Sequence, residues 1–162
     1  MKKLIAMSLA LITLLATLTA CGSKPAGGAA DVNLEEFYQT IFTDPENAPA
    51  MGPMDAEMLE AFYPGLTAVA LKQTVAYMPM ITAVPCEIVM VECENAADVD
   101  AVKAIFEARI DTMVNDHFNY PAVIEAWEKE ATVVSGGNYV AMLVVNGMTE
   151  QIVNNFNAAI AG

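Results

Sequence analysis

Residues 131–145 restrict the possible folds most strongly, because they place a tight turn between two strand-like runs. Residues 131–134 and 139–145 are rich in β-branched and apolar side chains, and Ser135-Gly136-Gly137-Asn138 separates them. This pattern predicts a β-hairpin, with positive φ at both Gly136 and Gly137 if the turn is of type I′. Residues 139–145 are largely apolar on both faces, so we expect this strand to be covered on both sides or nearly so.

The remaining pattern from residue 84 onward predicts one more strand and three helices. Residues 84–93 form an apolar run of strand length, and apolar residues at helical spacing follow Asn95. A short helix is predicted from Pro121 to Trp127, and a final helix after Gly147. We therefore predict an α+β fold with a small mixed or antiparallel sheet, order β-α-β-β-α in this C-terminal part, and helices on one face.

Two short helices are predicted before this part of the chain. The first covers residues 34–42 and is capped by Asn33, and the second covers residues 55–62. Residues 68–78 are predicted to be extended, with a break at Pro79.

The N-terminal residues have the layout of a bacterial export signal. Lys2 and Lys3 precede an apolar run over residues 4–18, and small residues follow it. This run is shorter than the roughly 20 residues that span a bilayer comfortably, which disfavours a permanent transmembrane helix. Leu18-Thr19-Ala20-Cys21 resembles the lipobox of bacterial lipoproteins, in which the cysteine receives a diacylglycerol on its sulfur and becomes the first residue.

The lipobox divides the chain into three predicted parts. They are a signal peptide over residues 1–20, the lipidated Cys21 with a flexible tether over residues 21–32, and a single α+β domain over residues 33–162. The expected location is the extracytoplasmic face of the cell membrane, which the protein contacts through lipid on Cys21. The alternative is a secretory signal with a chance cysteine, which the position of Cys21 after Leu-x-Ala disfavours.

The charge of the chain limits its partners. There are 20 acidic and 7 basic residues, and removal of Lys2 and Lys3 with the signal leaves a balance of −15. This balance argues against binding nucleic acid and against direct binding of anionic lipid headgroups. It is compatible with a self-repelling surface and with a site for cations or basic peptides.

Cys86 and Cys93 are the cysteines that remain after Cys21. A strand between them would separate their Cα atoms by about 23 Å, whereas a disulfide needs roughly 4.4–6.8 Å. Their odd spacing also puts them on opposite faces of the strand. We therefore predict two unpaired, buried thiols.

The chain lacks the common catalytic motifs, and no catalytic residue, metal site or cofactor is predicted. His117 is the only histidine, and a dyad would need it beside Cys86, Cys93 or Ser135. A histidine at this position can also simply favour the end of the long helix. Arg109 has two interpretations, a structural ion pair on the helix flank or a possible anchor for an anionic ligand.

Two groups of residues raise the question of a metal ion. Four carboxylates crowd the junction of the strand and the long helix and could hold calcium: Glu92, Glu94, Asp98 and Asp100. Methionine pairs at 51–54 and 78–80 could hold Cu(I). Acidic first turns and methionine-rich cores are the more ordinary explanations of both patterns.

One family resembles this sequence over residues 34–162. The resemblance rests on Pro85-Cys86-Glu87-Ile88-Val89-Met90-Val91, on Arg109 in the long helix, on Tyr120-Pro121 and on Gly137-Asn138-Tyr139-Val140. These residues are similar to the bacterial lipoprotein family of domains of unknown function numbered 4358. The resemblance implies a lipobox, a low-complexity tether and one small domain, and it implies no activity. Family members often carry a basic residue late in the central strand, where this chain has Glu92-Cys93-Glu94.

These observations favour a non-catalytic, surface-tethered binding or accessory module. The competing hypotheses are an acid–base hydrolase that uses paired carboxylates, and a carrier of Cu(I) or calcium. Two carboxylates that converge in a deep cleft would favour the hydrolase.

Overall fold

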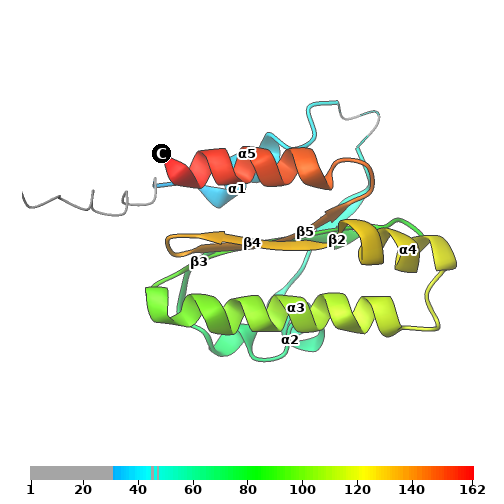
Figure 1. Ribbon diagram of the computed structural model, residues 1–162, viewed down its shortest axis with the longest axis horizontal. Coiled ribbons are helices and arrows are strands. Elements are labelled where there is room, and N and C mark those ends of the chain that lie inside the picture. The colour runs from blue at the N-terminus through cyan, green and yellow to red at the C-terminus, as the bar shows by residue number, and fades with distance from the viewer. Residues whose placement is uncertain (1–30, 45, 47) are drawn as a thin grey trace, which may run out of the picture.

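One five-stranded antiparallel sheet forms the centre of the computed structural model (Figure 1). The structure describes residues 31–44, 46 and 48–162. The strand order is β1-β2-β3-β5-β4, and every pairing is antiparallel. The strands are β1 (Met51–Pro53), β2 (Leu71–Pro79), β3 (Cys86–Cys93), β4 (Thr132–Gly136) and β5 (Tyr139–Val145). The predicted α+β class is confirmed.

Five α-helices accompany the sheet in the described residues. They are α1 (Leu34–Gln39), α2 (Ala56–Phe62), α3 (Val99–Asn115), α4 (Pro121–Glu130) and α5 (Thr149–Ala161). Local chemistry explains several starts: Asn33 accepts hydrogen bonds from free N–H groups of α1, and Asp55 does so for α2. Pro121 occupies the first turn of α4, where its missing N–H costs nothing.

Helices cover both faces of the sheet, which corrects the prediction that they lie on one face (Figure 1). α2, α3 and α4 pack on one face, and α1 and α5 pack on the other. The reason lies in β3 and β5, which are buried at every position. In β3, Val89 and Val91 point to the α3 side, whereas Ile88 and Met90 point to the α5 side. Both faces therefore need cover.

Each face carries its own hydrophobic core. Phe106 of α3 and Trp127 of α4 are buried in the first core, and Leu34 of α1 and Phe156 of α5 in the second. Burial of one such side chain stabilises the fold by about 1.5–3 kcal/mol. The central strands are thus fixed from both sides and hold the loops at their ends in place.

The predicted hairpin is confirmed, but its turn differs from the prediction. Gly136 is the last residue of β4 and pairs with Tyr139, so Gly137 and Asn138 form a two-residue loop. Gly137 has a φ of 57°, whereas neither Gly136 nor Asn138 has positive φ. The predicted type I′ geometry is therefore wrong. Positive φ at the first central residue alone fits a type II′ turn, which favours glycine there.

Replacement of Gly137 by valine is expected to destabilise the domain by about 1 kcal/mol or more, because a β-branched residue is strained at positive φ. A lower melting temperature in thermal unfolding would show this effect. Ser135→Val is the control, since Ser135 is exposed on β4 and has no positive φ. Equal melting temperatures for wild type and Gly137→Val would contradict a strained turn.

Candidate functional site

A hollow of about 210 Å³ opens at one end of the sheet, between two loops. The first loop, residues 80–85, joins β2 to β3, and the second, residues 116–120, joins α3 to α4. Figure 1 shows the second loop at the right-hand end of the molecule, far from the start of the described chain. The walls are mainly apolar and come from several elements: Phe62, Met78, Val84, Met113 and Trp127.

Exposed apolar side chains lie on the two loops that border this hollow. Among the described residues, the large hydrophobic side chains that face solvent are Met80 (74% exposed), Ile81 (59%), Phe118 (100%) and Tyr120 (59%). Two of them belong to each loop. We call these four residues the apolar rim. A cluster of exposed apolar side chains on one end of a small domain is typical of an interaction surface.

A buried ion pair forms the floor of the hollow. Arg109 on α3 donates from Nε to Glu87 Oε1 at 2.9 Å and from Nη2 to Glu87 Oε2 at 2.7 Å. The Tyr63 hydroxyl also donates to Glu87 Oε1. The guanidinium lies over the rings of Phe62 and Trp127, 4.8 and 5.4 Å from their centroids. Both partners of the pair are almost fully buried.

The environment of Arg109 favours its charged form. Burial would lower the pKa of Arg109, but the hydrogen bonds and the charge of Glu87 outweigh burial and raise it. Burial, together with Glu87, raises the pKa of Tyr63 well above 10.0. Of the two interpretations of Arg109, the contacts are those of a structural ion pair. Glu87 already accepts from two of the five N–H groups of the guanidinium and neutralises its charge, which weakens Arg109 as an anchor for a ligand anion.

Sequence reasoning missed Glu87 and Tyr63 as members of this cluster. One signal was present, because Glu87 is the only charged side chain within the apolar run 84–91. A charge inside a buried strand needs a partner, and Arg109 is the only arginine of the chain.

The two cysteines of the described chain are free and buried, as predicted. Cys86 belongs to the core on the α5 side and Cys93 to the core on the α3 side, which confirms that they lie on opposite faces. The Cys86 thiol donates to the Met51 sulfur at 3.2 Å. Burial, followed by the charge of Glu87, raises the pKa of Cys86 to about 12, and burial also raises the pKa of Cys93. Both thiols are therefore poor nucleophiles at neutral pH.

The structure places His117 and Ser135, the other candidates for a catalytic dyad, far from each other. His117 is exposed on the α3–α4 loop. Ser135 lies on β4 beside the hairpin turn, and the register of β4 and β5 places that turn at the other end of the sheet. Figure 1 shows the two regions at opposite ends of the molecule.

The carboxylates at the β3–α3 junction do not form a joint site. Glu92 accepts hydrogen bonds from Lys72 Nζ at 2.9 Å and Gln73 Nε2 at 2.7 Å. Burial would raise the pKa of Glu92, but these hydrogen bonds outweigh burial and lower the pKa. Within the described part of the chain, no three or more acidic, cysteine or histidine side chains form a group that could hold a metal ion.

The same side chains fix the point where the chain enters the domain. Gln73 accepts from the backbone N–H of Leu34 at 3.0 Å and donates to the carbonyl of Val32 at 2.8 Å. The N–H of Val32 donates to the Tyr139 hydroxyl at 3.1 Å. Tyr139 pairs with Glu92 at the end of the sheet opposite the hollow. The chain therefore enters the domain at one end, and the apolar rim lies at the other.

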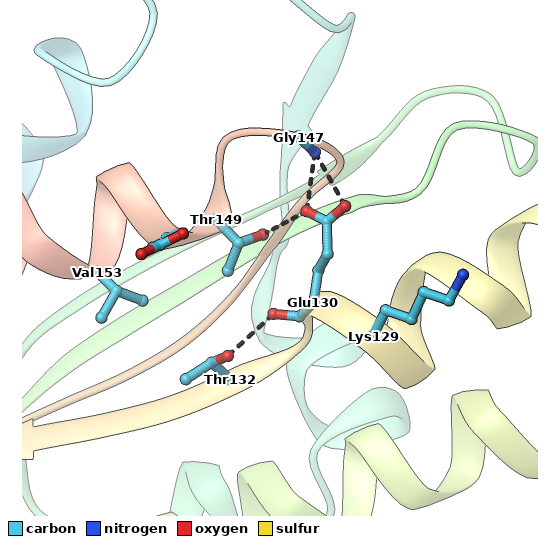
Figure 2. Close-up of a pocket in the computed structure, with 7 residues that line it drawn as sticks. Lys129, Glu130, Thr132, Gly147, Thr149 and Val153 are labelled. Atoms are coloured by element: carbon cyan, nitrogen blue, oxygen red, sulfur yellow. Dashed lines mark hydrogen bonds between the residues drawn. The ribbon is translucent and has the colours of Figure 1, made fainter.

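A second hollow, of about 390 Å³, lies between the end of α4 and the start of α5 (Figure 2). The Glu130 carboxylate accepts from the Gly147 N–H at 2.8 and 3.0 Å and from the Thr149 hydroxyl at 3.3 Å. Figure 2 shows the Lys129 side chain pointing away from this carboxylate. These polar groups satisfy one another and tie α4 to the turn before α5. No member of the apolar rim lines this hollow.

The positive charges of the described residues are all paired with carboxylates. The four pairs are Lys72–Glu92, Lys103–Asp100, Arg109–Glu87 and Lys129–Glu125. All 20 acidic residues of the sequence are described, so acidic residues exceed these four cations by 16. The surface thus carries a large negative excess and, in the described part, no unpaired cation.

Comparison with known proteins places residues 45–145 in one family. A family model described as a domain of unknown function (DUF4358) matches this range. No curated protein and no solved structure matches the chain. None of the helices in the described residues is long and apolar enough to cross a membrane.

Proposed function

The chain belongs to the family of domains of unknown function DUF4358, and from this premise we propose that it is a lipid-anchored, extracytoplasmic binding module without catalytic activity. The observation that carries the proposal is the opposite placement of the chain entry and the apolar rim. The anchor would lie at one end of the domain and the binding surface at the other.

The proposed anchor is Cys21, which lies outside the residues that the structure describes, as do the signal over residues 1–20 and most of the tether. The lipobox Leu18-Thr19-Ala20-Cys21 supports this part of the proposal. Two acyl chains on one residue give stable anchoring, whereas one chain gives only marginal binding.

The surface charge supports a position away from the lipid headgroups. A domain with 16 more acidic than basic residues is repelled by an anionic membrane surface. Gln73 donates to the carbonyl of Val32, and the N–H of Val32 donates to the Tyr139 hydroxyl. These bonds would hold the end of the tether against the end of the domain that faces the membrane. The apolar rim would then face outward, where a partner can reach it.

The state of the polar groups in the hollow supports binding rather than hydrolysis. Glu87 and Asp116 both line the hollow. Glu87 is held by Arg109 and Tyr63, and Asp116 accepts from the N–H of Phe118 at 2.9 Å and from the side chain of Asn119 at 3.0 Å. General acid–base catalysis needs a carboxyl group that can exchange a proton with substrate. Both carboxylates here are occupied by bonds that maintain the fold.

Fluorescence quenching at a membrane tests the proposed orientation. A fluorophore is attached to Phe118→Cys in one sample and to Ser135→Cys in the other, with the lipidated protein in vesicles that carry a headgroup quencher. The native cysteines do not interfere, because burial protects both thiols and lipid blocks Cys21. We expect stronger quenching at position 135, on the side of the tether, than at position 118. Equal or stronger quenching at position 118 would contradict the proposed orientation.

A further inference from the structure

Building on the proposed function, we infer that the apolar rim binds a basic peptide segment, one of whose large apolar side chains enters the hollow between the two loops. The partner class follows from the size of the hollow, from the chemistry of its wall and rim, and from the net charge of the whole domain.

The hollow has the size of a side chain rather than of a cofactor. Its volume of about 210 Å³ is below the ~300–1,000 Å³ typical of small-molecule pockets. Met78 and Met113 in its wall are flexible and polarisable, so they can adapt to different apolar side chains. Phe62 and Trp127 supply aromatic surface beside them. Such a wall fits an inserted aliphatic or aromatic side chain of a partner protein.

The rim supplies a contact surface around the inserted side chain. Ile81 and Met80 lie on one loop, and Phe118 and Tyr120 on the other, all of them more than half exposed. Aromatic residues and methionine are enriched in protein–protein interfaces, and the residues that dominate affinity lie near the interface centre. Phe118, which is fully exposed, contributes little to the fold and is free to pack against a partner.

The charge of the domain selects a basic partner over the alternatives. Each described cation already has a carboxylate partner, so the excess of 16 acidic residues leaves the domain with a net negative charge that would attract a cationic segment. The same excess would repel a second copy of the chain, nucleic acid and anionic lipid. A neutral apolar segment could fill the hollow but would lack the electrostatic attraction.

An NMR titration with synthetic peptides tests this inference. The protein is the chain from residue 21 with Cys21→Ser, labelled with ¹⁵N. The probe is a short peptide of lysine, leucine and one tryptophan, and two matched peptides replace its lysines by glutamates or its apolar residues by serines. We expect the lysine–leucine peptide alone to bind, with the largest amide shifts in residues 80–85 and 116–120. Phe118→Ser and Ile81→Ser should each raise its Kd by about tenfold or more.

Glu36→Gln is the matched control. It removes one exposed carboxylate from α1, away from the rim, and should change the Kd by less than about twofold. Ile81→Ser and Phe118→Ser should melt at the same temperature as wild type, because both side chains are exposed, and thermal melts check that the fold is intact.

The other outcomes distinguish the inference from the function on which it rests. The inference would be overturned if the amide shifts were spread over acidic residues outside the rim and did not change with Phe118→Ser. Such shifts would indicate ionic attraction alone. Equal binding of the glutamate–leucine peptide at the rim would overturn the basic partner but would leave the rim as a docking surface. If none of the peptides perturbs the rim, both the inference and the proposed binding function fail.

Discussion

Replacement of Arg109 by methionine is expected to destabilise the domain by about 3–5 kcal/mol, because it leaves the Glu87 carboxylate buried without its counter-charge. Glu87 is 2% exposed and accepts two hydrogen bonds from Arg109, which methionine cannot replace. The Tyr63 hydroxyl would remain as a donor, but a neutral hydroxyl does not replace the charge and the two hydrogen bonds of the guanidinium. The free energy of unfolding, measured by urea denaturation, should fall by this amount.

Lys129→Met provides the matched control, since it breaks an ion pair with Glu125 on the surface of α4. Exposed pairs of this kind contribute less than about 1 kcal/mol. The double variant Glu87→Met/Arg109→Met should recover much of the loss, because a buried pair can be exchanged for apolar side chains at little cost. Similar losses for Arg109→Met and Lys129→Met would show that the buried pair is not a structural element.

The central sheet was predictable because its signals are local. The apolar runs that became β3 and β5 and the glycine turn between β4 and β5 each depend on a few consecutive residues. The side of the sheet that each helix covers was not predictable in this way. An apolar stripe shows that a helix packs on something, but it does not show on which face. α3 and α5 each follow a central strand and yet lie on opposite faces.

The candidate site could be predicted only in part. The sequence marked Arg109 as a significant cation but did not reveal its partners. Glu87 lies 22 residues before Arg109, and Tyr63 lies 24 residues before Glu87, so neither contact follows from local spacing. The apolar rim depends on how two loops meet at one end of the fold. Ile81 and Phe118 are ordinary core-type residues in the sequence, and only the tertiary structure leaves them exposed.

The proposed anchor predicts that Cys21→Ala abolishes attachment of lipid to the protein. Without the thiol no diacylglycerol can be attached, so the chain should either leave the membrane fraction or remain unprocessed with residues 1–20 attached. Detergent-phase partitioning of cell fractions would show nearly all of the mature, membrane-bound species lost. Cys93→Ala is the control, because this buried cysteine of β3 has no part in anchoring and its variant should partition like wild type.

The mass of the mature protein extracted from membranes decides whether Cys21 carries the proposed lipid anchor. We expect a chain that begins at Cys21 and whose mass exceeds that of residues 21–162 by a diacylglycerol group. Peptide sequencing by mass spectrometry should place that group on Cys21. An unlipidated chain, or a chain that begins at another residue, would contradict the claim.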